Sequence, residues 1–399
     1  MSLSKRIKRH VSATPHLFRV ICHLGFEKTC AKELQQLGLV SPCTISDGAI
    51  FLEAKIEDAW RFLAFSRTAT RIEMQIAEFR AENFGRLEKK SAEIPWELYF
   101  FKSSIPAVHS FCKKSRLYHS DAISERVSAI IQNALNERGI LPADLDDGFS
   151  PAWNSPTQTI FVRLENDICK ISLDLAGEPL YKRGFNRHVE SAPVRDTLAA
   201  SILFEAEFYS KKILLDPMAG SGTFSLEAAL FKAQAHLNKT RHFATESLPF
   251  FRPAAWNFLT SHFQGIDASS LSKIAASDFS EKAFSTLQFN LISAGAAPFL
   301  KNLPAETLQI SRANFFDLPQ AKAGTLLVLN PPYGKRISAD ITTLYREIGK
   351  KIRSDFTQAD IAIMIPGLAA EKAFALTPNH FIKTSNGGID VKVFFIKNG

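Results

Sequence analysis

The stretch LLVLNPPYGKR, residues 326–336, places a polar side chain and an aromatic ring directly after an apolar run. Two consecutive prolines cannot extend a sheet ladder, because proline has no N–H to donate. The amide oxygen of Asn330 and the carbonyl of Pro331 therefore offer two acceptors close together, which suit the N–H bonds of an exocyclic amine. Tyr333 adds a face on which a planar base can stack. The pattern predicts a site for an aromatic amine; a purely structural turn is the alternative.

A second stretch, LLDPMAGSGT from residue 214, is typical of a strand followed by a glycine-rich turn and a helix. In an open α/β sheet, ligands bind at the carboxyl ends of the strands, which is where Asp216 stands. Gly220 and Gly222 let the backbone pass close to a ligand. Two hydroxyl residues of the turn can cap the helix that follows, Ser221 and Thr223. A phosphate loop would need a Gly-Lys-Ser/Thr sequence, and a dinucleotide fingerprint would need a third glycine. Both are disfavoured, and a small nucleoside ligand is favoured.

An acid that could accept hydrogen bonds from two ribose hydroxyls is expected at the end of the next strand. Asp278, in KIAASDFS, stands at that place. It lies about 55 residues beyond Gly222, whereas the dinucleotide fingerprint has its acid after about 20. The excess is an aromatic and proline-containing insertion, residues 239–265. A helix N-cap is the alternative role for Asp278.

The elements that must position these residues alternate from about residue 190. Strands alternating with helices of 10–16 residues predict a parallel sheet covered on both faces. We expect strands at 212–217, 273–278, 307–314, 325–330, 361–366 and 391–397, and helices at 192–208, 222–235, 280–295 and 341–354.

The part before residue 166 has a different rhythm, which predicts α+β units of ferredoxin-like type. We expect strands at 17–24, 48–54, 71–79, 105–115 and 159–166, and helices at 27–38, 56–66 and 121–138. A further strand is expected directly after this part, at 168–177.

Length and composition restrict the class of protein. A chain of 399 residues with 46% hydrophobic content is expected to form several globular domains. No apolar run reaches the roughly 18 residues of a membrane helix, and the five cysteines have no metal-ligand spacing. We therefore expect a cytoplasmic protein with no membrane contact and no metal. The net charge of +8 favours a polyanionic partner without establishing one. The oligomeric state cannot be inferred.

DPMAGSGT together with NPPYG resembles the motifs of S-adenosylmethionine-dependent class I amino-methyltransferases. The segment 181–203 looks like the one that precedes the methionine-binding loop in bacterial 23S rRNA guanine-N2 methyltransferases, and residues 384–396 resemble their closing hairpin. The N-terminal part, with RLYHS at 116–120, is similar to a THUMP domain, an RNA-binding module. The resemblance covers residues 15–398 and is greatest to the N-terminal half of large-subunit methyltransferase K/L.

The resemblance implies a domain order and a fold. It implies a ferredoxin-like α+β domain at 1–75, a THUMP domain at 76–165 and a catalytic domain at 166–399. The catalytic domain is expected to be a Rossmann-like class I methyltransferase with a seven-stranded, mostly parallel sheet.

Roles carried over by the resemblance fall into three groups. S-adenosylmethionine would be bound by Thr197, Asp216, Met218, Gly220, Ser221, Gly222, Thr223, Asp278, Phe279, Asn314 and Phe315. Asn314 stands where the family usually has an acid for the adenine amine. The catalytic residues would be Asn330, Pro331, Pro332 and Tyr333. RNA would contact Lys113, Arg116, His119, Arg183 and Arg187.

The reaction implied is methyl transfer to N2 of a guanosine in RNA, with 23S rRNA expected and tRNA as an alternative. Two alternatives to RNA methylation stay open at this point. The same NPPY geometry would serve N6-adenine or N4-cytosine methylation of DNA, and a non-catalytic RNA-binding protein could retain the fold.

Overall fold

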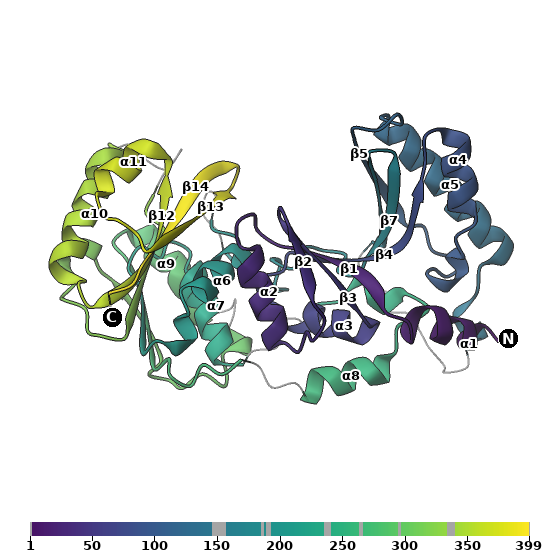
Figure 1. Cartoon of the computed structure of the whole chain (residues 1–399). Coiled ribbons are helices and arrows are strands. Elements are labelled where there is room, and N and C mark those ends of the chain that lie inside the picture. Colours follow the sequence, from purple (N-terminus) through teal and green to yellow (C-terminus); the bar gives the residue numbers. More distant parts are fainter. Residues whose placement is uncertain are drawn as a thin grey trace. The chain divides into compact units, whose positions relative to one another are not determined.

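The computed structural model describes residues 2–145, 157–184, 187–188, 193–234, 241–262, 266–293, 297–332 and 340–398. The chain divides into two compact units (Figure 1). Unit 1 comprises Met1–Ile21, Leu34–Leu180 and Arg241–Gln264, and unit 2 comprises Cys22–Glu33, Tyr181–Thr240 and Gly265–Gly399.

Unit 1 contains one continuous sheet of seven strands in the order β2-β3-β1-β4-β7-β6-β5. Its strands are β1 (His16–Ile21), β2 (Cys43–Ser46), β3 (Ala49–Ala54), β4 (Arg71–Arg80), β5 (Ala107–Lys113), β6 (Thr159–Glu165) and β7 (Ile168–Asp174). Every neighbouring pair is antiparallel except β5 with β6. Its helices are α1 (Leu3–Ile7), α3 (Ile56–Phe65), α4 (Phe84–Ala92), α5 (Ser120–Arg138) and α8 (Pro253–His262). The helix α4 was not expected from the sequence.

The single sheet alters the domain boundaries expected from the sequence. Strand β4 runs across the boundary at 75/76, and the boundary at 165/166 falls in the turn between β6 and β7. Both of these strands pair within the first sheet, β7 with β4 as well as with β6. The boundary of the first unit therefore lies near Leu180, and the α+β units before it share one sheet.

Two segments belong to a different unit from the residues on either side of them in the sequence. The insertion after α7 (Thr223–Lys232) folds into unit 1. There the indole Nε1 of Trp60 donates to Thr245 Oγ1 at 3.0 Å, and the Trp60 ring packs edge-on against Phe251. In return, the start of α2 (Glu27–Gln36) belongs to unit 2, where Thr29 Oγ1 donates to Glu205.

Unit 2 contains a second seven-stranded sheet, in the order β10-β9-β8-β11-β12-β14-β13. Its strands are β8 (Ile213–Asp216), β9 (Lys273–Asp278), β10 (Leu308–Arg312), β11 (Thr325–Leu329), β12 (Ala359–Pro366), β13 (His380–Asn386) and β14 (Ile389–Ile396). The first five strands in the order are parallel, and β14 and β13 are antiparallel. The expected seven-stranded, mostly parallel sheet is confirmed, as is the closing hairpin.

Helices cover both faces of this sheet, which explains why its central strands are continuously apolar. The helices are α6 (Asp196–Glu205), α7 (Thr223–Lys232), α9 (Glu281–Gln288), α10 (Ile341–Asp355) and α11 (Gly367–Phe374). Along β11, Leu326 and Val328 join the core formed with α6 and α7, while Leu327 and Leu329 join the core formed with α10. Figure 1 shows α10 and α11 on one side of β12, and α6 and α7 on the other. Within the described ranges, no helix is both long and apolar enough to cross a bilayer.

Candidate active site

The carboxyl ends of β8, β9 and β11 lie side by side, because these strands are parallel and β8 is the middle one. The chain leaves them at Asp216, Asp278 and Asn330. A cavity of about 670 Å³ opens at this edge, entirely within unit 2. Its walls come from residues 217–221, 278–280 and 314–316, with Pro193, Val194, Thr223, Phe224, Ala283, Asn330, Pro332 and Leu344 completing it.

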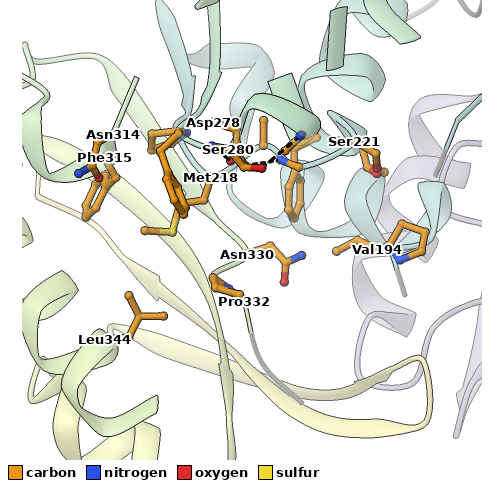
Figure 2. Close-up of a pocket in the computed structure, with 18 of the residues that line it drawn as sticks. Val194, Met218, Ser221, Asp278, Ser280, Asn314, Phe315, Asn330, Pro332 and Leu344 are labelled. Atoms are coloured by element: carbon orange, nitrogen blue, oxygen red, sulfur yellow. Dashed lines mark hydrogen bonds between the residues drawn. The ribbon is translucent and has the colours of Figure 1, made fainter. Parts of the chain in front are cut away.

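Asp278 ties two of these walls together. Its Oδ2 accepts from the backbone N–H of Gly220 at 3.0 Å, and its Oδ1 accepts from that of Ser280 at 3.0 Å (Figure 2). The N-cap of α9 is Ser280, whose hydroxyl accepts from Ala283, so the N-cap alternative for Asp278 is wrong. A half-buried carboxylate with further lone pairs facing the cavity can accept hydrogen bonds from a ligand's hydroxyls.

The two glycines of the turn serve different purposes. Gly220 has φ +55° and lines the cavity, and a Cβ placed there would meet nothing within 4 Å. Gly222 has φ +81°, and its Cβ would lie 2.4 Å from Leu287 Cδ1. Gly220 therefore leaves room for a ligand, whereas Gly222 permits the close packing of the turn against α9.

Asp216 is fully buried and is not among the residues that line the cavity. Its Oδ2 accepts from the backbone N–H and the hydroxyl of Ser225, at 3.2 and 2.7 Å, so it fixes the first turn of α7. Burial raises the pKa of Asp216 to about 7, and nearby Asp278 adds to the shift while the Ser225 hydrogen bonds oppose it. Asp216 therefore supports the start of α7 and does not face the cavity.

Asn330 presents an unused acceptor on the cavity wall. Its Oδ1 is buried and has no hydrogen-bond partner among the described residues. Figure 2 shows Asn330 and Pro332 on the wall opposite Met218 and Asp278. Pro331 is buried and does not line the cavity, and Tyr333 lies outside the described residues. A buried polar atom without a partner costs free energy, so an acceptor held in this way is suited to a donor from a ligand.

The remaining cofactor candidates divide between lining and supporting positions. Met218, Ser221, Thr223, Phe279, Asn314 and Phe315 line the cavity. Phe279 is 69% exposed, so its ring is available for stacking. The side-chain oxygen of Asn314 accepts from the Phe316 N–H at 3.2 Å and caps a short turn.

Thr197 is fully buried and does not reach the cavity. Its Oγ1 lies 2.9 Å from His23 Nε2, a residue of the N-terminal segment that belongs to unit 2. Burial, together with a smaller contribution from the charge of Arg195, lowers the pKa of His23 to about 4, so the imidazole is neutral at pH 7. The sequence gave no signal for this contact, because the two residues are 174 positions apart.

Two arginines expected to contact RNA are engaged in ion pairs within unit 2, Arg183 fully buried and Arg187 partly buried, which corrects the expectation that they face RNA. Arg183 is 3% exposed and donates to both carboxylate oxygens of Glu227, at 3.0 and 3.1 Å. Arg187 lies 2.5 Å from Asp196 and donates to Thr223 Oγ1 at 3.3 Å. Guanidinium groups satisfied in this way brace the turn and α7 and are not open to a phosphate. Burial raises the pKa of Asp196 to about 6, although Arg187 opposes the shift.

Asn290 is a structural residue of the site that the sequence analysis missed. It is fully buried, and its amide donates to the carbonyls of Ser221 and His188 at 2.8 Å each. Its oxygen accepts from the His188 N–H. Because its side-chain amide makes these three hydrogen bonds, Asn290 holds the glycine-rich turn and the segment at His188 in fixed positions.

The other three RNA candidates, Lys113, Arg116 and His119, are exposed in unit 1.

Comparisons with known proteins find relatives and solved structures named as methyltransferases or methylases. A curated relative, ribosomal RNA large subunit methyltransferase K/L of Syntrophotalea carbinolica, is 28% identical over 383 residues, which are 92% of this chain and 52% of that protein. This chain therefore spans about half the length of that relative. A possible methylase of Clostridium difficile 630 has a TM-score of 0.82 at 25% identity, covering 97% of this chain and 99% of that one.

The structure of SMU.472, described as a methyltransferase and solved with SAH, has a TM-score of 0.79 at 23% identity and covers 97% of this chain and 99% of that one. At the N-terminus, the RlmL ferredoxin-like domain matches residues 18–73. The RMKL-like methyltransferase domain matches residues 183–392, which include every wall of the cavity. The chain belongs to the RMKL-like methyltransferase family.

Proposed function

We propose that this chain binds S-adenosylmethionine in the cavity of unit 2 and transfers the methyl group to the exocyclic N2 amine of a guanosine in RNA, with 23S rRNA as the substrate. Family membership supports methyl transfer. The relative named as a large subunit rRNA methyltransferase supports the choice of rRNA. The single observation that carries the proposal is the buried Oδ1 of Asn330, which has no partner among the residues that the structure describes and shares a cavity with Asp278 and the glycine-rich turn.

The residues present fit the cofactor. Asp278 can accept from the ribose hydroxyls while it holds Gly220 and Ser280. The space beside Gly220 admits a ligand next to the backbone. Asn314, Phe315 and the exposed ring of Phe279 line the same wall and suit a planar adenine. When bound, the cofactor supplies an electrophilic sulfonium methyl group.

Asn330 would act on the nucleophile. The lone pair of the guanine N2 amine is delocalised into the ring, so this amine is a poor nucleophile. Asn330 Oδ1 would accept from one of its N–H bonds, orient the nitrogen, and stabilise the positive charge that develops on it. Pro331, whose carbonyl is expected from the sequence to be the second acceptor, is buried and does not line the cavity. Because Asn330 is neutral, no strong base is required, and the proton leaves after transfer. The base must be unpaired or flipped to enter such a cavity.

We further propose that unit 1 carries the RNA-binding part, with a ferredoxin-like region supported by the match at 18–73 and a THUMP region after it. Lys113 and Arg116 are 70% and 66% exposed and would contact phosphates together with exposed His119. The ion pair of Lys113 with Glu165 is open to solvent, and such pairs are weak. Arg116 also pairs with half-buried Glu82 and buried Asp167 through an exposed guanidinium.

The test is methyl transfer from labelled S-adenosylmethionine to rRNA, tRNA and DNA, followed by nucleoside analysis. We expect N2-methylguanosine in rRNA that lacks the modification. Label in tRNA alone would retain the chemistry and overturn the choice of rRNA. N6-methyladenine or N4-methylcytosine in DNA would overturn the proposed substrate, and absence of label with intact cofactor binding would overturn catalysis.

A further inference from the structure

We propose that the open face of strands β5 and β6 in unit 1 is a stacking platform for unpaired bases of single-stranded RNA, formed by His109, Phe111 and Phe161. The inference rests on the proposed function for its relevance to the substrate, but it concerns a different surface from the cavity and from the ends of the strands in unit 2.

The two faces of this part of the sheet differ sharply. On one face, Ile160, Val162 and Leu164 of β6 are buried. Helix α5 packs against β5 on that side, where Ser124 Oγ donates to Ser110 Oγ at 2.9 Å. Figure 1 shows α4 and α5 along one face of β4, β5 and β7. Residues that alternate with these point to the opposite face.

The opposite face carries rings where a solvated sheet would carry small polar residues. His109 is exposed, Phe111 is 54% exposed, and Phe161 is half-buried. Strand pairing places His109 opposite Phe161 and Phe111 opposite Arg163. The His109 and Phe161 rings have centroids 6.0 Å apart with planes at 29°, and Phe111 follows at 6.3 Å from Phe161. Three neighbouring rings therefore share one surface.

Cations are interleaved with these rings. The guanidinium of Arg163 lies 5.6 Å from the ring centroid of Phe111 and 4.9 Å from that of Phe161, and Arg71 lies 5.5 Å from the latter. Glu73 accepts from Arg163 at 2.8 Å, so the guanidinium stays over the rings and extends the planar surface. Lys113 and Lys170, 70% and 45% exposed, supply charge at the margin of this face.

These features favour RNA over a protein partner. Lysine is depleted at protein interfaces, whereas exposed Lys113 and Lys170 lie at the margin of this face. Single-stranded nucleic acid requires both components, because bases stack on aromatic rings and phosphates pair with cations. The exposed pairs Lys113–Glu165 and Lys170–Glu78, at 3.2 and 3.7 Å, can exchange their carboxylate for a phosphate at little cost. The net charge of +8 has the sign that this ligand needs.

The experiment uses the full chain and a single-stranded oligouridylate of about 12 nucleotides, with a hairpin of the same length as competitor. Fluorescence anisotropy at fixed salt measures affinity. We expect Phe111→Ala to weaken binding of the single strand about 5- to 150-fold, the range for loss of one stacked base. Affinity for S-adenosylmethionine should not change.

Phe381→Ala is the matched control. Phe381 is also on a strand, is 45% exposed and has a lysine ammonium 5.0 Å from its ring, but it belongs to unit 2. It should bind the oligonucleotide as the unaltered chain does. Phe111→Trp should retain affinity, and its added fluorescence should be quenched when a base stacks on the indole.

Unchanged affinity of Phe111→Ala, or unquenched emission from Phe111→Trp at saturating RNA, would overturn the platform. If rRNA is nevertheless methylated, the proposed function stands and only this surface is wrong. Binding that depends on Phe111, without methyl transfer to any RNA, would support the platform and overturn the proposed function.

Discussion

Each unit contains a seven-stranded sheet, but the two sheets present their polar groups in different places. In unit 2, the buried oxygens Asn330 Oδ1 and Asp216 Oδ1 have no partner within the described part of the chain, and both belong to residues at strand ends. In unit 1, charges on the open face are paired, Arg163 with Glu73 and Lys113 with Glu165. Parallel neighbours end at the same edge, so their terminal side chains converge. On β5 and β6 of unit 1, which are also parallel, the rings stand at alternate positions along the strands and therefore share a face rather than an edge.

The largest difference between the units should be in how much an ion pair contributes to the free energy of unfolding. Glu227→Gln leaves the guanidinium of Arg183 buried, with both side chains 2% exposed or less, and should lower the free energy of unfolding by about 3–5 kcal/mol. Glu165→Gln, in a pair whose side chains are 70% and 58% exposed, should cost at most about 1 kcal/mol. Urea denaturation measures both. Equal losses in the two variants would contradict the contrast.

The second prediction concerns the unpaired acceptor of unit 2. Asn330→Ala should lower kcat about 10²- to 10³-fold, because one acceptor for the developing charge is removed. The dissociation constant for S-adenosylmethionine should be unchanged. Asn257→Ala is the control, since Asn257 is exposed on α8 in unit 1. Near-normal turnover of Asn330→Ala would remove the catalytic role proposed for this residue.

The third prediction compares two buried aspartates, one in each unit. Burial raises the pKa of Asp216 and of Asp174 to about 7, from an ordinary value of 3.8. A carboxyl that keeps its proton in the folded state makes stability fall as pH rises from about 4 to about 7. Asp216→Asn should remove this loss, so its stability relative to the unaltered chain should increase over that interval.

Asp174→Asn should show the same rise relative to the unaltered chain, since the pKa of Asp174 is also about 7, but from a lower starting stability, because Asp174 is paired with Arg71 and also accepts from the N–H groups of Ala176 and Gly177. Its replacement leaves a guanidinium without its carboxylate. Urea midpoints measured at several pH values test both variants. A pH-independent difference between Asp216→Asn and the unaltered chain would show that Asp216 is ionised throughout.

The smallest effect is expected on the open face of unit 1. Lys113→Ala should weaken RNA binding about equally for all sequences and reduce the slope of log affinity against log salt by about one. The slope is measured by anisotropy at several salt concentrations. An unchanged slope would show that Lys113 does not contact an RNA phosphate. A loss of affinity confined to one RNA sequence would indicate that Lys113 recognises a base.

Much of unit 2 could be predicted because its signals are local. The alternation of strands and helices, the polar residue at each strand end and the glycine-rich turn all appear within short segments, and the structure brings Asp278, Gly220 and Asn330 to one cavity. The contact between His23 and Thr197 could not be predicted, and neither could the lock formed by Asn290, since these partners are distant in sequence.

Arginine positions show the same limit in another form. Arg183 and Arg187 were expected to contact RNA, yet Glu227 and Asp196 pair with them. A charge pattern records how many cations a segment has, but not whether an acid from a distant helix neutralises them. The expected RNA contacts that remain exposed are on strand β5 and the segment that follows it.

By itself, the sequence determined which residues end the parallel strands and which positions must be glycine, because apolar runs and positive φ angles are local requirements. Only the tertiary structure decided that β4 to β7 join one sheet, that the insertion after α7 folds into unit 1, and that Phe111 stands exposed on its face of the sheet. The physical reason is that alternation along a strand shows which side is apolar, whereas the pairing of strands and the covering of a face depend on burial between segments far apart in the chain.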